Sequence, residues 1–144
     1  TSIRAERRML RKKKNRPPEY SLHVFHHFDE RTRRSLQVFL VQTIKEFTSF
    51  GYEILLDAVL RERLIQLKIL GLRTTPLIMP GVGPAKGYRG FTNLKGSYVL
   101  SIIKLDGEAN DFQVDVTPSQ MGIKGNPAHP FILVSNTPVP LQVS

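Results

Sequence analysis

Cysteine is absent from this 144-residue chain, which excludes a disulfide framework, a thiolate nucleophile and a thiolate metal site. No apolar run approaches the roughly 20 residues that a helix needs to cross a bilayer. The charged N-terminus is not followed by an apolar core, so it does not have the form of a secretory signal, and its lysine cluster is unlike an organellar transit peptide. An apolar content of 40% is ordinary for one small globular domain.

Acidic residues are nearly absent from the first 16 positions, where Glu6 is the single one. The same stretch holds eight basic residues: Arg4, Arg7, Arg8, Arg11, Lys12, Lys13, Lys14 and Arg16. The whole chain has 21 basic and 12 acidic residues, so residues 17–144 keep 13 and 11 and carry only +2 of the net +9. A dense basic run gains free energy by displacing counterions condensed on phosphates or by lying against an anionic membrane leaflet. The sequence therefore predicts a polyanion-binding arm; the alternative is a solvated tail that keeps the protein soluble.

Two prolines separate this arm from the rest of the chain. Pro17 and Pro18 stop any helix and favour extended backbone before them. With Tyr20 they form a P-P-x-Y sequence, which WW domains bind as a polyproline II ligand; an ordinary linker is the alternative. We therefore expect a basic N-terminal arm over residues 1–19 and a single domain over residues 20–144.

Residues 20–28 alternate between two faces, which predicts a strand. This segment contains His23, His26 and His27, a cluster that suggests a metal site. Strand pleating places His26 opposite the other two, and no carboxylate or cysteine lies nearby at ligand spacing. We therefore predict no metal site, and partly buried imidazoles instead.

The next two segments have apolar residues at intervals of three and four, which predicts amphipathic helices. The first helix begins after Asp29 or Thr32, either of which can cap a helix, and it ends at Gly51. Its apolar stripe consists of Leu36, Phe39, Leu40, Ile44 and Phe47. The second helix spans about residues 53–70 and ends at Gly71. Two helices joined across one glycine indicate a bent helical pair lying on a sheet.

Arg31, Arg33 and Arg34 fall in the first turn of the first predicted helix, where cations oppose the helix dipole. Such a cluster either meets an external anion or stays exposed at a small cost in stability. The three arginines are therefore candidate secondary contacts to a polyanion.

Proline and glycine supply seven of the fifteen residues at positions 76–90, so no regular structure is expected there. The G-x-G-x-x-x-G spacing matches neither nucleotide-binding fingerprint. Basic and aromatic residues interleave at Lys86, Tyr88, Arg89 and Phe91, which suits contact with nucleic acid. Lys86 and Arg89 complete the candidate secondary contacts.

Three later segments predict strands. Residues 97–105 are apolar on both faces and predict a central strand covered on both sides, followed by a turn at Asp106 and Gly107. Residues 112–117 alternate, which predicts a strand exposed on one face, and residues 131–134 predict a short last strand. The expected fold is α+β, with a small antiparallel sheet covered by two amphipathic helices and an extended basic N-terminal arm.

No group of residues forms a recognisable catalytic signature. The carboxylate pairs Asp106 with Glu108 and Asp111 with Asp115 are typical of surface charge, and His129 has no serine or aspartate motif beside it. We therefore expect that the protein is not an enzyme and uses neither a metal nor a cofactor. The weaker alternative is an enzyme that uses the glycine-rich segment.

Three features of the sequence belong together. The first is a Lys/Arg-rich arm followed by P-P-x-Y, and the second is the order of a strand, an amphipathic helix and a proline-bearing loop up to Pro84. The third is the stretch NLKGSYVLSI at residues 93–102. In these features the chain resembles the rhabdovirus matrix proteins, whose animal members have a similar Leu-Tyr-Lys-Gly-Thr segment at the start of a strand.

The resemblance implies a structural protein with a small α+β domain that self-associates into homo-oligomers. Its arm would link the coiled nucleocapsid to an anionic membrane surface, and P-P-x-Y would recruit a WW-domain protein for budding. The expected location is then the virion and the host cell, at the membrane periphery or on the nucleocapsid.

The alternative function is that of a ribosomal or other ribonucleoprotein subunit, an organellar ribosome included. Such proteins also combine a small folded domain with a basic extension that threads into RNA, where phosphate contacts dominate the affinity. The two hypotheses agree that the arm binds a polyanion and differ in its identity.

Overall fold

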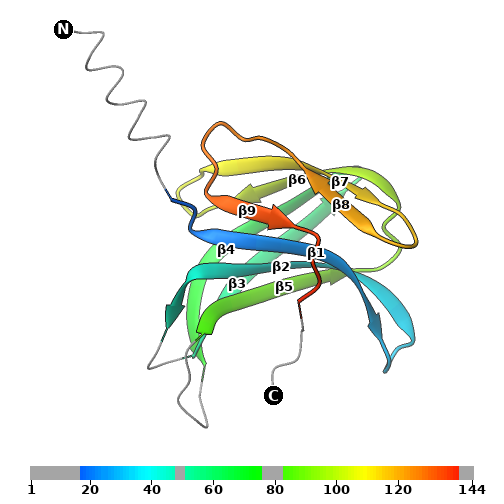
Figure 1. The fold of residues 1–144 in the computed structure, drawn as a ribbon, viewed down its shortest axis with the longest axis horizontal. Coiled ribbons are helices and arrows are strands. Elements are labelled where there is room, and N and C mark those ends of the chain that lie inside the picture. Colours follow the sequence, from blue (N-terminus) through cyan, green and yellow to red (C-terminus); the bar gives the residue numbers. More distant parts are fainter. Residues whose placement is uncertain (1–16, 48–50, 76–82, 140–144) are drawn as a thin grey trace, which may run out of the picture.

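The described part of the chain is a single β-sheet domain. The computed structural model describes residues 17–47, 51–75 and 83–139, and these ranges contain nine strands and no helix (Figure 1). Strands take up 71% of the described residues. They are β1 (Tyr20–Asp29), β2 (Arg34–Phe47), β3 (Gly51–Arg61), β4 (Leu64–Thr75), β5 (Gly83–Phe91), β6 (Gly96–Ile103), β7 (Ala109–Val116), β8 (Met121–Lys124) and β9 (Ile132–Ser135).

The nine strands form one sheet in the order β8-β7-β6-β4-β3-β5-β2-β1-β9. Most neighbours are antiparallel, and the parallel pairs are β1 with β9, β3 with β5 and β4 with β6. The two edge strands, β8 and β9, lie near each other, so the sheet curls into a nearly closed, barrel-like shape (Figure 1). Its inner face holds one continuous apolar core.

The predicted α+β fold is wrong, because the first predicted helix is β2 and the second is β3 with most of β4. On the inner face of β2, Phe39 and Val41 are fully buried in the core. On its outer face, Val38 and Leu40 form a second buried cluster, against which Val139 packs. A strand covered on both faces loses its period-two alternation, so its apolar residues also fall at intervals of three and four.

Asp29, predicted to cap a helix, closes a turn between β1 and β2. Its Oδ1 accepts a hydrogen bond from the Arg31 backbone N at 3.1 Å, and its Oδ2 accepts one from the Thr32 hydroxyl at 3.0 Å. Arg33 follows with a left-handed φ of 57°. The short acceptor side chain that caps helices also closes such turns, so residue type alone does not separate the two outcomes.

The two glycines predicted to end helices belong to strands β3 and β4. Gly51 begins β3. Gly71 pairs with Leu55 next to a register shift between Leu55 and Leu56, and its φ is +141°. At this bulge the backbone of Gly71 adopts a positive φ that residues with a side chain rarely take, so the position favours glycine.

The segment predicted to lack regular structure contains β5. This strand pairs antiparallel with β2, and it joins β3 through the single parallel pair Glu53–Lys86. At the next residue, Gly87, a Cβ atom would stand 2.2 Å from the carbonyl oxygen of Ile54. Glycine is therefore required where β5 approaches β3.

Replacing Gly87 with alanine should lower the free energy of unfolding by at least about 2 kcal/mol, because the backbone of β3 or β5 must move to admit the methyl group. Gly122→Ala is the matched control, since Gly122 also lies in a strand and a Cβ atom there meets nothing within 4 Å. Urea denaturation of both variants measures the difference. Equal stabilities would contradict the close approach of the two strands.

Four strands predicted from the sequence are confirmed as β1, β6, β7 and β9. The turn after β6 is also confirmed, and Gly107 in this turn has a φ of +91°. The coverage of β6 differs from the prediction. Leu100 and Ile102 are fully buried on the inner face, but Val99 on the outer face is 50% exposed. This strand is central in the sheet and covered on one side.

Two asparagine side chains help to join the edges of the curled sheet. Asn110 of β7 is 1% exposed; its Oδ1 accepts from the Phe131 backbone N at 2.9 Å, and its Nδ2 donates to the His129 carbonyl at 3.1 Å. Asn136, after β9, donates from Nδ2 to the Met121 carbonyl of β8 at 3.1 Å. These bonds hold the segments around β9 against β7 and β8 and leave the buried Asn110 fully paired.

A lysine joins the start of β1 to the hairpin between β6 and β7. Lys104 Nζ lies 2.6 Å from a Glu19 carboxylate oxygen and 2.9 Å from one of Glu108, and the lysine side chain is only 11% exposed. Burial by itself lowers the pKa of Lys104, but the hydrogen bonds from Glu19 and then Glu108 outweigh it and raise the pKa above its ordinary value.

The contribution of Lys104 to stability should depend on alkaline pH. Because the folded state holds the proton more tightly, the contribution is complete below the unfolded pKa of about 10.4 and is lost as the pH rises through the folded pKa. Lys104→Gln should therefore cost about 1 kcal/mol near pH 7 and less above about pH 11. Lys68→Gln, at an exposed lysine, is the control. Urea denaturation at both pH values tests this, and an unchanged cost would refute it.

Candidate functional site

One end of the sheet gathers several turns and five of the seven arginines in the described residues. The β1–β2 turn lies beside the end of β5, since Gln37 pairs with Phe91. The β3–β4 turn lies beside the start of β6, since Leu64 pairs with Val99. We call this the basic end. Its basic residues are Arg31, Arg33, Arg34, Arg61, Arg63 and Lys95, and its acidic residues are Asp29, Glu30 and Glu62.

A short loop of residues 92–95, the crossing loop, runs across the basic end from β5 to β6. Two strands, β3 and β4, lie between β5 and β6 in the sheet. Leu94 of the loop is 6% exposed and belongs to the core, and its backbone N donates to Gln37 Oε1 at 3.0 Å. The Arg63 guanidinium donates to the Lys95 carbonyl. The crossing loop is thus anchored to β2 and to the β3–β4 turn.

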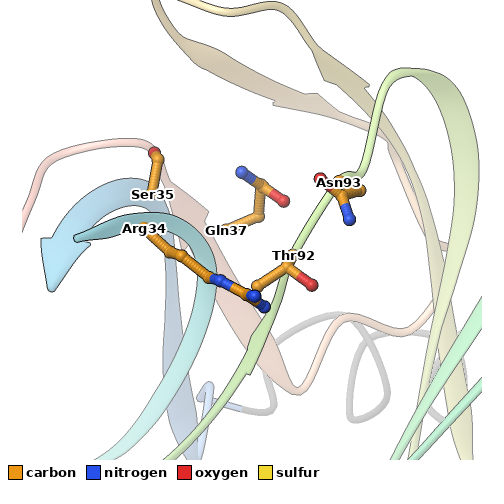
Figure 2. Close-up of a pocket in the computed structure, with 5 residues that line it drawn as sticks. All are labelled: Arg34, Ser35, Gln37, Thr92 and Asn93. Carbon is orange, nitrogen blue, oxygen red and sulfur yellow. The ribbon is translucent and has the colours of Figure 1, made fainter. Parts of the chain in front are cut away.

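A polar pocket of about 430 Å³ opens between the start of β2 and the crossing loop. It is lined by Arg34, Ser35, Gln37, Thr92 and Asn93. Figure 2 shows the Arg34 side chain extending toward Thr92, with the Gln37 amide between Ser35 and Asn93. The lining offers a guanidinium, two hydroxyls and two carboxamides but no carboxylate, so it is suited to a ligand with anionic or acceptor groups.

Gln37 is held in place beside this pocket, where it is 5% exposed. Its Oε1 accepts from Leu94, and its Nε2 lies 3.5 Å from Nδ1 of His26. The other ring nitrogen of His26, Nε2, lies 2.7 Å from the Thr117 carbonyl oxygen. A carbonyl oxygen only accepts, so Nε2 of His26 donates, and in the neutral ring Nδ1 is then the acceptor for Gln37. This chain of contacts orders the wall of the pocket.

The β1–β2 turn presents three of the predicted secondary contacts. Arg31, Arg33 and Arg34 are all exposed, and among the described residues their guanidinium groups form no ion pair. Asp29, a carboxylate next to the same turn, is already bonded to the Arg31 backbone N and the Thr32 hydroxyl. The three arginines are therefore available to an external anion, and Arg34 alone also lines the pocket.

The other two predicted secondary contacts do not join this cluster. Lys86 is exposed and lies opposite Gln42, toward the far end of β5. Arg89 donates to the carbonyl oxygens of Tyr88 and Leu56. The Arg89 guanidinium thus bonds to backbone carbonyls of β5 and β3, where it helps to hold these two strands together.

The predicted arm residues fall outside the described ranges: Arg4, Arg7, Arg8, Arg11, Lys12, Lys13, Lys14 and Arg16. Of the P-P-x-Y sequence, Pro17 is exposed and Pro18 is half-buried, whereas Tyr20 is the first residue of β1 and packs against the core. Burial raises the pKa of the Tyr20 hydroxyl. A WW domain could take this tyrosine only if it left the sheet, and its role as a ligand stays a prediction.

The three histidines of β1 lie on two faces, as the pleat predicts. His26 points to the inner side, where it meets Thr117, and Nδ1 of His23 on the other face lies 3.2 Å from the Thr137 carbonyl oxygen. In the described part of the chain, no three His, Asp or Glu side chains gather at metal-binding distance.

Sequence reasoning missed most of the pocket. The sequence predicts a helix at Ser35 and Gln37, does not single out Thr92, and includes Asn93 only as the first residue of the NLKGSYVLSI stretch. Phe28, 59% exposed at the end of β1, was predicted only as part of the strand. The one signal that led to this site is the arginine cluster of the turn.

Comparison with protein families, with curated proteins and with solved structures found no match for this chain. No helix that could span a membrane occurs in the described ranges. Fold and site together define an all-β, barrel-like domain with a donor-rich pocket at its basic end.

Proposed function

We propose that this protein is a non-enzymatic RNA-binding subunit of a ribonucleoprotein assembly, with the basic N-terminal arm as its main RNA contact. The carrying observation is the charge distribution, in which residues 1–16 hold eight basic residues and one acidic residue, whereas residues 17–144 are nearly neutral. A local excess of this kind favours a polyanion through counterion release. Five of the eight cations are arginines, which suit bidentate contacts to phosphate.

Where the arm joins the domain, a lysine of the domain is already paired with carboxylates. This supports the arm itself as the RNA contact there. There Lys104 is paired with both Glu19 and Glu108, so the charge beside the arm is largely compensated. The uncompensated arginines lie in the turn after β1, at the other end of that strand. Nine residue steps at about 3.3 Å put roughly 30 Å between the two. One extended strand of RNA is long enough to contact both.

The matrix-protein hypothesis receives less support. It rested on a resemblance that implied an α+β domain, and the domain is all-β. The proposal therefore keeps the shared element, RNA binding by the arm, either in a ribonucleoprotein or on a nucleocapsid. Membrane binding is treated as an outcome of the experiment.

Neutralising the arm should abolish most of the RNA affinity. In the full chain, the eight basic residues of the arm are replaced by glutamine, and binding of a labelled single-stranded RNA is measured by fluorescence anisotropy between about 50 and 200 mM salt. The parent should lose affinity with a slope in log K against log salt of up to about −5, since each neutralised phosphate contributes about −0.7. The arm-neutral variant should have a much shallower slope.

The control replaces three exposed lysines of the domain by glutamine, at positions Lys45, Lys68 and Lys124. This variant should keep the slope of the parent within about one unit. An arm-neutral variant with unchanged affinity and slope would refute the proposal. So would a parent protein that binds anionic vesicles and ignores RNA.

A further inference from the structure

Phe28 is exposed on a face whose other apolar residues are buried. On the inner face of β1, Leu22 and Val24 are fully buried, but Phe28 at the end of the strand is 59% exposed. Burying a phenylalanine side chain stabilises a fold substantially, and this largely exposed ring gives up much of that contribution. Phe28 therefore contributes little to the core, and its surface neighbours indicate another role for the ring.

Phe28 is paired with a residue of the donor-rich pocket. Phe28 and Ser35 are directly paired across β1 and β2, and His26 and Gln37 form the next pair on the same face. Directly opposed residues have Cβ atoms about 5 Å apart and share a face. Ser35 and Gln37 both line the pocket, so Phe28 is the strand partner of one of its lining residues.

The pocket itself suits a polar, anionic ligand of modest size. Its volume of about 430 Å³ falls within the range of small-molecule sites. Arg34 supplies a planar fork of donors that matches phosphate oxygens. The hydroxyls of Ser35 and Thr92 and the amide of Asn93 can both donate and accept, as the edges of a sugar and a base require.

From this juxtaposition we infer a subsite for one nucleotide of a single-stranded RNA, with its base stacked on Phe28 and its phosphate held by Arg34. The inference rests on the proposed RNA binding and adds the place where a base is contacted. Aromatic rings on a β-surface stack bases with little sequence preference, because every base has a π-face. Together with the Arg34 guanidinium, which lines the pocket, such a ring would distinguish a nucleotide from a bare phosphate.

A second pocket in the described domain is less suited to this role. It lies along β7 and β8 and is lined by Asp111, Phe112, Gln113, Lys124, Gly125 and Asn126. Its carboxylate, Asp111, would repel a phosphate, and Phe112 is buried in the core. The pocket at the basic end, by contrast, has no carboxylate in its lining, and Phe28, the strand partner of its Ser35, is exposed.

The test compares two probes on the full chain. One is a labelled oligouridylate of about 12 nucleotides, within the site sizes of single-strand-binding β-barrels, and the other is a strand of the same length without bases. Phe28→Ala should weaken binding of the oligouridylate about tenfold and leave the abasic strand unchanged, because stacking requires a base. Phe28→Tyr should restore the affinity. Arg34→Gln should weaken both probes several-fold.

The controls are chosen for matched exposure. Leu133→Ala removes another exposed apolar side chain, at 54% exposure, and Arg73→Gln removes an exposed arginine near the end of β4, away from the basic end; both should bind as the parent does. Equal affinities of the parent and Phe28→Ala for the oligouridylate would overturn the subsite. So would equal losses of Phe28→Ala on both probes. The arm-neutral variant reports on the proposed function separately, since it should lose affinity for both probes alike.

Discussion

The whole sheet depends on one close approach between two backbones. β5, β2, β1 and β9 form one half of the sheet, and β3, β4, β6, β7 and β8 form the other, and within the ladder they are joined by the single pair Glu53–Lys86. Gly87 makes this junction possible, because any side chain there would collide with the carbonyl of Ile54. Beyond the junction the two strands diverge, and the Arg89 guanidinium bonds the Leu56 carbonyl in the opening. On the opposite side of the sheet, no backbone ladder joins the two halves of the described domain. There the side chains of Asn110 and Lys104 connect them instead.

This junction also determines where the pocket lies. Since β5 must reach β6 across β3 and β4, the crossing loop passes over the end of the core and seals it with Leu94. The same loop brings Thr92 and Asn93 to the start of β2. The pocket is therefore a consequence of the strand order, and its walls come from segments about 57 residues apart in the chain, as the bond between Gln37 and Leu94 shows.

Strand β7 could be predicted because only one of its faces is covered. β7 alternates because Phe112 and Val114 meet the core while their neighbours meet water. β2 could not be predicted in this way, since Val38 and Leu40 are buried on its outer face as well. Local chemistry was equally ambiguous: an aspartate caps helices and closes turns, and Gly71 could end a helix or occupy a bulge. Charge pointed to Arg34. Phe28 and Ser35 meet only through pairing between β1 and β2, and Asn93 reaches the pocket through the crossing loop; no local pattern reveals either.

In the proposed function, the arm and the basic end would divide RNA recognition between two kinds of contact. Phosphate contacts supply affinity without reading a base, and base contacts supply discrimination. Eight cations in sixteen residues are suited to the first kind, because they add counterion release at many positions of a strand. A fixed wall is needed for the second kind, and Gln37, held by Leu94 and by His26, provides one. The start of β1, where residues 17–19 lead into the strand, lies roughly 30 Å from the turn arginines. In the proposal the arm would capture any strand, while an unpaired base would stack on Phe28.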